Sequence, residues 1–344
     1  MKLLSLFSGV GAFEKALKNL NVDYELVGYS ETDKYATKAY SLIHGEPESK
    51  NLGDITKINA SGLPKDIDLI TYGFPCQDIS IAGNKQGFFD NQGEKTRSGL
   101  FFNALNVIRE TQPKVAIAEN VKNLTGKRFK NEFEIVLNSL CSAGYNNYYK
   151  VLNAKDYGVP QNRERVFIVS IRKDIDTEKF EFPKPIELNK RLKDLLEDDV
   201  DEKYYLKGAK ATIINDLFDS TNRLLQIGTL DIKGRDSMRR VYSSEGISPT
   251  LTSMQGGNRQ PKIIDDTYRN RLPRIYEEYS YRIRKLTPKE CFRLMGFEDR
   301  DIDILIENKI SNTQLYKMAG NSICVPVLEC IFKQLICSFA RRKE

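Results

Sequence analysis

The sequence predicts an α/β protein with a doubly wound sheet in its first half. Two observations lead to this prediction. Short apolar runs alternate with helical patterns over residues 1–171, which is typical of βαβ units and a mainly parallel sheet. From about Lys173 the chain turns instead to prolines, an acidic run and short strands separated by turns. We therefore expect a second, smaller, β-rich lobe.

The expected elements follow one another in a regular order. Strands are predicted at Lys2–Phe7, Tyr24–Ser30, Leu69–Tyr72, Val115–Glu119 and Val166–Ile171, and helices at Ala12–Leu20, Lys34–His44, Leu100–Thr111, Glu132–Ala143, Thr287–Met295 and Val325–Phe339. Residues 79–99 form a long loop with four glycines, and a loop of that length in a compact domain is usually a lid or a binding loop.

The composition of the 344 residues is that of a globular protein, with 40% hydrophobic and 29% charged residues. No apolar run approaches the ~18–20 residues that span a bilayer, so we expect a cytoplasmic protein. Six cysteines and one histidine form no zinc pattern, and we expect no metal. The net charge is +6, and residues 268–290 concentrate basic side chains. This cluster fits a phosphate-facing surface or a merely solvated face.

One cysteine is placed for chemistry. Cys76 follows the predicted strand Leu69–Tyr72, and Glu119 ends another strand. In the usual 3-2-1-4-5 order these strands are neighbours, so the thiol and the carboxylate meet at the carboxyl edge of the sheet. Because His44 is the only histidine, Ser-His and Cys-His catalysis are nearly excluded. A thiol beside a carboxylate suits attack at C6 of cytosine while N3 is protonated or hydrogen-bonded.

A nucleoside site is predicted at the same edge. Phe7–Gly11 contains Gly-Val-Gly between a strand and a helix, where glycines let a ligand approach the backbone. Glu14 breaks the dinucleotide fingerprint, Glu31 stands where an acidic side chain binds ribose, and Asp54 can contact an adenine. Together they indicate a nucleoside cofactor without a pyrophosphate, for which S-adenosylmethionine is the natural candidate.

Further along, the run Gln161–Arg165 precedes a strand. Arg163 and Arg165 are two residues apart in an extended segment, so their guanidinium groups are expected to point the same way, toward a base oxygen or a phosphate. Taken alone, a surface salt-bridge cluster would explain them as well.

In this order the motifs resemble the DNA cytosine-5 methyltransferase family, in the form found in bacteria and phages. The resemblance covers nearly the whole chain, from Phe7–Gly11 through Phe74-Pro75-Cys76-Gln77 to Ala319–Ile323. It implies a Rossmann-like S-adenosylmethionine-dependent methyltransferase sheet (residues 1–180), a smaller β-rich target-recognition domain (181–290) and a hinge with a returning C-terminal helix (291–344).

The resemblance also implies roles for single residues. Cys76 would attack C6, Glu119 would engage N3 and the exocyclic amine, and Arg163 and Arg165 would hold the base and the thiolate region. The S-adenosylmethionine pocket would be lined by Phe7, Ser8, Gly9, Val10, Gly11, Glu31, Thr32, Asp54, Ile55, Pro75, Leu100, Asn321 and Ile323. Thr32 stands where some members carry a tryptophan, so that stacking contact is lost.

In the β-rich lobe, the resemblance implies that Arg240 contacts a guanine, since arginine is bidentate to O6 and N7. Thr250 resembles a phosphate contact of the family. The turn Lys233–Met238, with Ser237, would fill the gap left by the extruded base, and Ser80 in the long loop would complete the DNA contacts.

We therefore expect a monomeric enzyme that acts on double-stranded DNA, near the nucleoid, by flipping out one cytosine. A restriction endonuclease would be a genetic partner, not a physical one. Two alternatives remain at this point: a cytosine-5 methyltransferase that modifies tRNA, and a non-catalytic DNA-binding relative.

Overall fold

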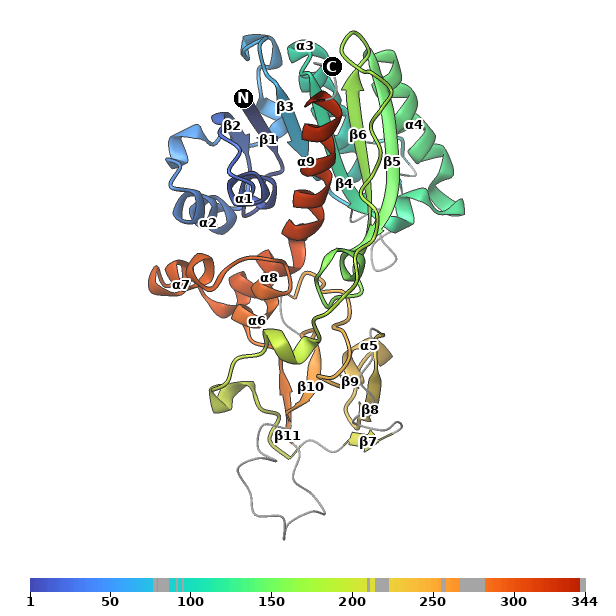
Figure 1. Cartoon of the computed structure of the whole chain (residues 1–344). Helices are drawn as coiled ribbons and strands as arrows, with labels where there is room; N and C mark the ends of the chain where they lie inside the picture. Colours follow the sequence, from blue (N-terminus) through green and yellow to red (C-terminus); the bar gives the residue numbers. More distant parts are fainter. Residues whose placement is uncertain are drawn as a thin grey trace. The chain divides into compact units, whose positions relative to one another are not determined.

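The computed structural model describes residues 1–76, 79, 87–90, 92–94, 96–208, 211–213, 223–254, 258–265 and 282–340 (Figure 1). The chain divides into two compact units. The first contains Met1–Leu152, Glu164–Lys184 and Val327–Glu344, and the second contains Asn153–Arg163 and Pro185–Pro326. These units are defined by compactness alone, so the predicted functional division at residues 180 and 290 stays a prediction.

A six-stranded mixed sheet forms the centre of the first unit, which confirms the predicted α/β class. Its order is β2-β1-β3-β4-β6-β5, with β1 (Lys2–Leu6), β2 (Glu25–Ser30), β3 (Leu69–Tyr72), β4 (Val115–Val121), β5 (Tyr145–Asn153) and β6 (Glu164–Arg172). β1 pairs in parallel with β2 and β3, β3 pairs in parallel with β4, and β6 runs antiparallel to β4. Beyond β2, one parallel bridge joins Tyr29 to Asn51.

The helices of this unit are α1 (Ala12–Asn19), α2 (Lys34–His44), α3 (Phe101–Thr111), α4 (Lys130–Ser142) and most of α9 (Val325–Ala340). α2 matches its prediction because both ends are marked: the Asp33 side chain accepts from the backbone of Tyr35, and Gly45 ends the helix with a φ of 70°. One core cluster joins side chains of α3 and α4, among them Phe101 and Val136, to β3 and β4. Burial of each such large side chain stabilises the fold by about 1.5–3 kcal/mol.

The second unit contains a five-stranded sheet of order β11-β10-β9-β8-β7. The strands are β7 (Ala211–Ile213), β8 (Gln226–Leu230), β9 (Arg240–Tyr242), β10 (Lys262–Asp265) and β11 (Arg282–Lys285), and the helices are α5 (Asp236–Arg239), α6 (Pro288–Arg293), α7 (Asp299–Glu307) and α8 (Asn312–Asn321). The short strands match the expected β-rich lobe. α5, α7 and α8 were not predicted.

A buried ion network joins this sheet to α6. The Arg284 guanidinium, which is 0% exposed, donates to both carboxylate oxygens of Glu290 at 2.8 and 2.9 Å and to Asp265 at 3.1 Å. Glu290 is also part of a capping box with Thr287 at the start of α6. The sheet and the helix are therefore fixed to each other by charge-assisted hydrogen bonds.

One stretch, Asn312–Phe339, is by length and composition apolar enough to cross a membrane. The expectation that no run would approach spanning length was therefore wrong for this segment. Half of its most apolar window is buried inside the protein, as in a core helix, and a single such helix is weak evidence for a membrane span.

Candidate active site

Cys76 lies four residues beyond the end of β3, in a turn that is fixed on both sides. The Phe74 ring, 2% exposed, packs 5.4 Å from Phe101 and 6.3 Å from Tyr72 and Phe88. The Cys76 carbonyl accepts a hydrogen bond from the backbone of Ile79 at 3.1 Å. Cys76 itself is half-buried. The buried Phe74 ring therefore fixes the turn, and Cys76 follows it two residues later.

Glu119 comes from the neighbouring strand, as predicted. Tyr72 of β3 is in register with Ala118 of β4, so Glu119 and the Gly73–Cys76 turn extend from the same edge of the sheet. The next residue, Asn120, is 2% exposed and donates from Nδ2 to the Phe74 carbonyl at 3.0 Å. Asn120 therefore ties the strand of the carboxylate to the turn of the thiol, which the sequence patterns did not indicate.

The two arginines of the Gln161–Arg165 run have different partners. Arg165, in β6, places its Nε 2.9 Å from Glu119 Oε1, with both side chains mostly buried. This ion pair fixes the carboxylate. Arg163 belongs to the other compact unit, where its guanidinium donates to the carbonyls of Leu251 at 2.8 Å, Gly320 at 3.2 Å and Ser322 at 2.6 Å. The two arginines therefore have different partners within the protein, and their common direction toward one ligand stays a prediction.

Around Arg163 the backbone is tightly held. Gln161, fully buried, donates to the Leu294 carbonyl at 2.8 Å and accepts from the backbone of Leu251 at 3.2 Å. Thr250 donates its hydroxyl proton to the Asn162 carbonyl. A Cβ at Gly320 would lie 1.9 Å from the Thr252 carbonyl oxygen, so only glycine fits there. Gln161 and Arg163 thus position the backbone at residues 250–252, and Arg163 also holds 320–322.

The predicted cofactor loop has an unusual backbone. Phe7, Gly9 and Gly11 have φ values of 53°, 56° and 77°, a left-handed conformation that is strained for phenylalanine and costs about 1–3 kcal/mol. Internal hydrogen bonds hold this shape, because the N–H groups of Ser8, Gly9 and Gly11 donate to the Ser30 carbonyl at 3.1 Å, the Glu31 carboxylate at 3.0 Å and the Ser8 carbonyl at 2.9 Å. A Cβ at Gly9 would meet nothing within 4 Å, so space lies beside it.

Glu31 is bound to this loop. Its carboxylate accepts from the backbone of Gly9 at 3.0 Å and from Thr32 and Asp33 at 2.8 Å each. Burial raises the pKa of Glu31, while these backbone hydrogen bonds oppose the rise. Asn51, which sequence patterns did not single out, makes two hydrogen bonds with the Glu31 backbone, at 3.0 and 3.1 Å. It therefore sets the position of Glu31.

The other predicted cofactor residues are distributed over both units. Asp54 accepts at Oδ1 from the backbone and hydroxyl of Thr56, which lowers the pKa of Asp54. Val10 and Ile55 are buried, Ser8, Pro75 and Leu100 are half-buried, and Thr32 is exposed. Asn321 and Ile323 belong to the second unit, at and beyond the end of α8. Their contribution to the pocket stays a prediction.

The only histidine supports the cofactor loop from behind. His44 Nε2 lies 3.0 Å from the Val10 carbonyl, and a Cβ at Gly11 would come within 2.2 Å of the same nitrogen. Burial lowers the pKa of His44 to about 3, so the ring is neutral and donates from Nε2. The Tyr40 ring packs 4.8 Å from His44, and its hydroxyl donates to the buried Glu14 at 3.0 Å. His44 therefore has a structural task, since it is buried and bonded to the backbone of the Phe7–Gly11 loop.

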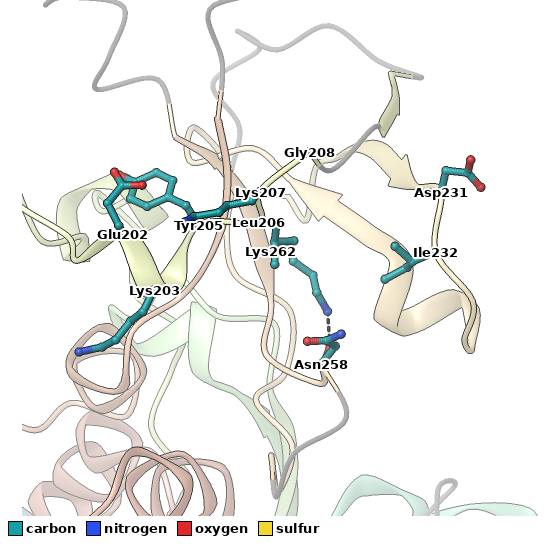
Figure 2. A pocket seen from close by; sticks show the side chains of 10 residues that line it. All are labelled: Glu202, Lys203, Tyr205, Leu206, Lys207, Gly208, Asp231, Ile232, Asn258 and Lys262. Atoms are coloured by element: carbon teal, nitrogen blue, oxygen red, sulfur yellow. Dashed lines mark hydrogen bonds between the residues drawn. The ribbon is translucent and has the colours of Figure 1, made fainter.

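In the second unit two of the predicted DNA contacts, Ser237 and Arg240, lie in α5 and directly after it. Ser237 is in α5, and Arg240 donates to Asp236 of the same turn at 2.8 Å from Nε. Beside this turn is a pocket of about 620 Å³, lined by residues 202–203, 205–208, 231–232, Asn258 and Lys262 (Figure 2). Ser80 and the arginines 269, 271 and 274 lie outside the described residues. Among the described residues there is no group of three or more potential metal ligands.

Comparison with known proteins assigns this site to a family. A family model described as C-5 cytosine-specific DNA methylase matches residues 1–337. The orphan methyltransferase M.SPBetaI of Bacillus phage SPbeta is 36% identical over 440 aligned positions, covering 100% of this chain and 99% of that protein. The type II methyltransferase M.HhaI of Haemophilus parahaemolyticus is 36% identical over 333 positions, covering 96% and 93%.

Solved structures show the same fold at lower identity. The Entamoeba histolytica methyltransferase EhMeth has a TM-score of 0.68 and 16% identity, covering 100% of this chain and 99% of its own. The S. pombe Dnmt2 methyltransferase has a TM-score of 0.62 and 19% identity, with 98% of each chain covered. The resemblance predicted from the motifs is confirmed by the family match and the curated relatives.

Proposed function

The chain belongs to the C-5 cytosine-specific DNA methylases, which are enzymes, and we propose that it transfers a methyl group from S-adenosylmethionine to C5 of a cytosine flipped out of duplex DNA. The observation that carries the proposal is the edge formed by β3 and β4. Cys76 and Glu119 extend from two strands paired in register, and Asn120 and Arg165 fix them there.

The residues at this edge have distinct tasks. Cys76 attacks C6 as a thiolate and forms an S–C6 bond, while Glu119 donates a proton or a hydrogen bond to N3 and the ring electrons move to C5. Arg165 holds the Glu119 carboxyl in place through the 2.9 Å contact. After C5 has accepted the methyl group, N3 returns its proton to Glu119, and the proton on C5 passes to a water molecule. The S–C6 bond then breaks and the thiolate returns.

S-adenosylmethionine fits the loop of the first unit. When bound, it supplies a methyl group on a positively charged sulfur, which a carbon nucleophile can accept. The open space beside Gly9, in a loop whose shape is held by hydrogen bonds to Ser30 and Glu31, suits its polar amino-acid end. Glu31 suits the ribose hydroxyls, since its carboxylate has lone pairs beyond those that the backbone uses.

The DNA supplies the reacting base from outside the stack. Extrusion of one cytosine costs a few kcal/mol of pairing and stacking, and contacts of the β-rich lobe, with Arg240 and Thr250 as the proposed residues, offset this cost. Arg163 acts in this proposal by positioning residues 251 and 320–322 through its three carbonyl contacts. A cytoplasmic enzyme acting near the nucleoid, as a monomer, completes the proposal.

The test is methyl transfer from labelled S-adenosylmethionine to duplex DNA, single-stranded DNA and tRNA. Wild type is expected to label duplex DNA, and Cys76→Ala is expected to abolish labelling. Cys141→Ala is the matched control, because Cys141 is an exposed cysteine at the end of α4. Labelling of tRNA in preference to DNA would favour an RNA-modifying enzyme. Full activity of Cys76→Ala would contradict the nucleophile, and failure to bind S-adenosylmethionine would indicate a non-catalytic relative.

A further inference from the structure

A fully buried lysine lies beside the proposed DNA-contacting turn. Lys262 is the first residue of β10, in register with Val241 of the parallel strand β9 and with Lys285 of the antiparallel strand β11. Its side chain is 1% exposed. Figure 2 shows the ammonium group reaching across the pocket to Asn258, while other lysines of the pocket rim extend away from it.

The Lys262 ammonium connects two segments of the chain. Nζ donates to the Met238 carbonyl at 2.8 Å and also to the Asn258 carbonyl. Met238 lies in α5, and Asn258, with a φ of 57°, is in the turn that leads into β10. Both acceptors are main-chain oxygens, so the cation fixes backbone positions rather than side chains.

Burial of the Lys262 ammonium costs stability. Within the part of the chain that the structure describes, no carboxylate forms an ion pair with Lys262. Burial and the nearby charge of Lys285 lower the pKa of Lys262 to about 8. A buried cation without a counter-charge lowers stability relative to an apolar side chain of similar volume. A gain in stability therefore does not explain a lysine at this position. Its two hydrogen bonds, which fix Met238 and Asn258 relative to each other, do explain it.

The α5 turn in turn sets the position of Arg240. Asp236, the first residue of α5, accepts from Arg240 Nε at 2.8 Å and from Nη2 at 2.5 Å. Arg239 ties the other end of the turn to the Leu230 carbonyl at 3.0 Å. If Met238 loses its bond to Lys262, α5 is free to shift. Asp236 then moves with α5, and so does the Arg240 guanidinium that is bonded to it.

We propose that Lys262 is a specificity-determining positioning residue, which holds α5 against the Asn258 turn so that Arg240 meets its base edge at one fixed place. This inference rests on the proposed function, since it requires a DNA substrate whose sequence is recognised. Arginine contacts to a base edge depend on geometry. A loosened support therefore lowers discrimination between bases more than it lowers the rate at the preferred site.

The experiment uses the full-length enzyme and a randomised duplex DNA library. After methylation in vitro, bisulfite sequencing defines the preferred site of wild type and its rate relative to single-base variants of that site. Lys262→Met keeps the apolar stem and removes the ammonium. For this variant we expect the discrimination ratio, the methylation rate at the preferred site divided by the rate at a single-base variant, to fall about tenfold at one or two adjacent base pairs. The unfolding temperature is expected to equal or exceed that of wild type, because the buried charge is gone.

Lys203→Met is the matched control, since Lys203 lines the same pocket but is exposed and paired with Asp201. It is expected to keep the wild-type ratio. The proposal is overturned if Lys262→Met keeps the wild-type ratio. It is also overturned if all sites lose activity equally together with a lower unfolding temperature. Lys262→Gln, uncharged and able to donate one hydrogen bond, decides by the same ratio if the methionine variant does not fold. Absence of any methylation by wild type would instead contradict the proposed function.

Discussion

Replacement of Asn120 by alanine tests how the thiol is placed. Asn120 Nδ2 donates to the Phe74 carbonyl at 3.0 Å, and Oδ1 accepts from the backbone of Val121 at 2.8 Å, both in buried surroundings. Loss of the side chain leaves the Phe74 carbonyl without this donor, which costs about 1–3 kcal/mol of unfolding free energy. Because the Phe74 ring stays packed on Phe101, the turn is expected to shift rather than to unfold.

Such a shift matters because Cys76 is two residues away. A displacement of about 1 Å at a reacting atom can lower a rate by about 100-fold. We therefore expect Asn120→Ala to lower the single-turnover rate of methyl transfer by about two orders of magnitude at saturating DNA, measured where denaturant titration shows the variant to be folded. Asn19→Ala is the control, since Asn19 is exposed and its side-chain amide donates to Glu329. A folded Asn120→Ala enzyme within about threefold of the wild-type rate would refute this reasoning.

Three further predictions concern the supports of the site. Gly11→Ala is expected to weaken S-adenosylmethionine binding by at least tenfold in calorimetry. The new Cβ would lie 2.2 Å from His44, and the backbone at residue 11 is left-handed. Gly45→Ala is the control, since Gly45 is also left-handed but its Cβ would meet nothing within 4 Å, and the affinity should not change. The folded-state pKa of His44 is depressed to about 3 from an ordinary 6.5, so its contribution to stability is complete above pH 6.5 and falls as pH decreases toward 3, by about 2 kcal/mol at pH 5. Thermal unfolding of wild type and His44→Gln from pH 4 to 8 measures it, and parallel curves would argue against the depressed pKa. Glu290→Ala is expected to cost about 3–5 kcal/mol in urea titrations, because the buried Arg284 loses two charge-assisted hydrogen bonds and keeps Asp265 as its counter-charge. Glu202→Ala, which breaks the exposed pair with Arg282, should leave the free energy of unfolding close to that of wild type.

Elements with capping residues at both ends could be predicted from the sequence. α2 was predicted to the residue because Asp33 and Gly45 mark its limits. β5 was missed because residues 145–153 alternate weakly and carry asparagines and a lysine on a sheet edge. Asn51, which no predicted strand covered, forms a parallel bridge with Tyr29, and its side chain bonds the Glu31 backbone.

In the site, the groups at strand ends could be predicted, and the residues that support them could not. Strand ends predicted that Cys76 and Glu119 follow neighbouring strands at one edge of the sheet, and the pairing of β3 with β4 confirms that these strands are neighbours. Their supports could not be predicted, because Asn120 bonds a residue 46 positions away and His44 one 34 positions away. The spacing of Arg163 and Arg165 predicted a common direction. In the structure Arg163 donates to the carbonyls of residues 251, 320 and 322, and Arg165 pairs with Glu119, so their common direction toward a ligand stays a prediction.

The central claim is that Cys76 bonds covalently to the target cytosine, and trapping tests it most directly. Duplex DNA carrying 5-fluorocytosine at the methylated position cannot lose a proton from C5, so the enzyme is expected to remain attached in the presence of S-adenosylmethionine. Digestion and mass spectrometry should then find the modified base, with its added methyl group, on the peptide that contains Cys76. A stable complex mapped to another residue, or formed equally well by Cys76→Ala, would contradict the account.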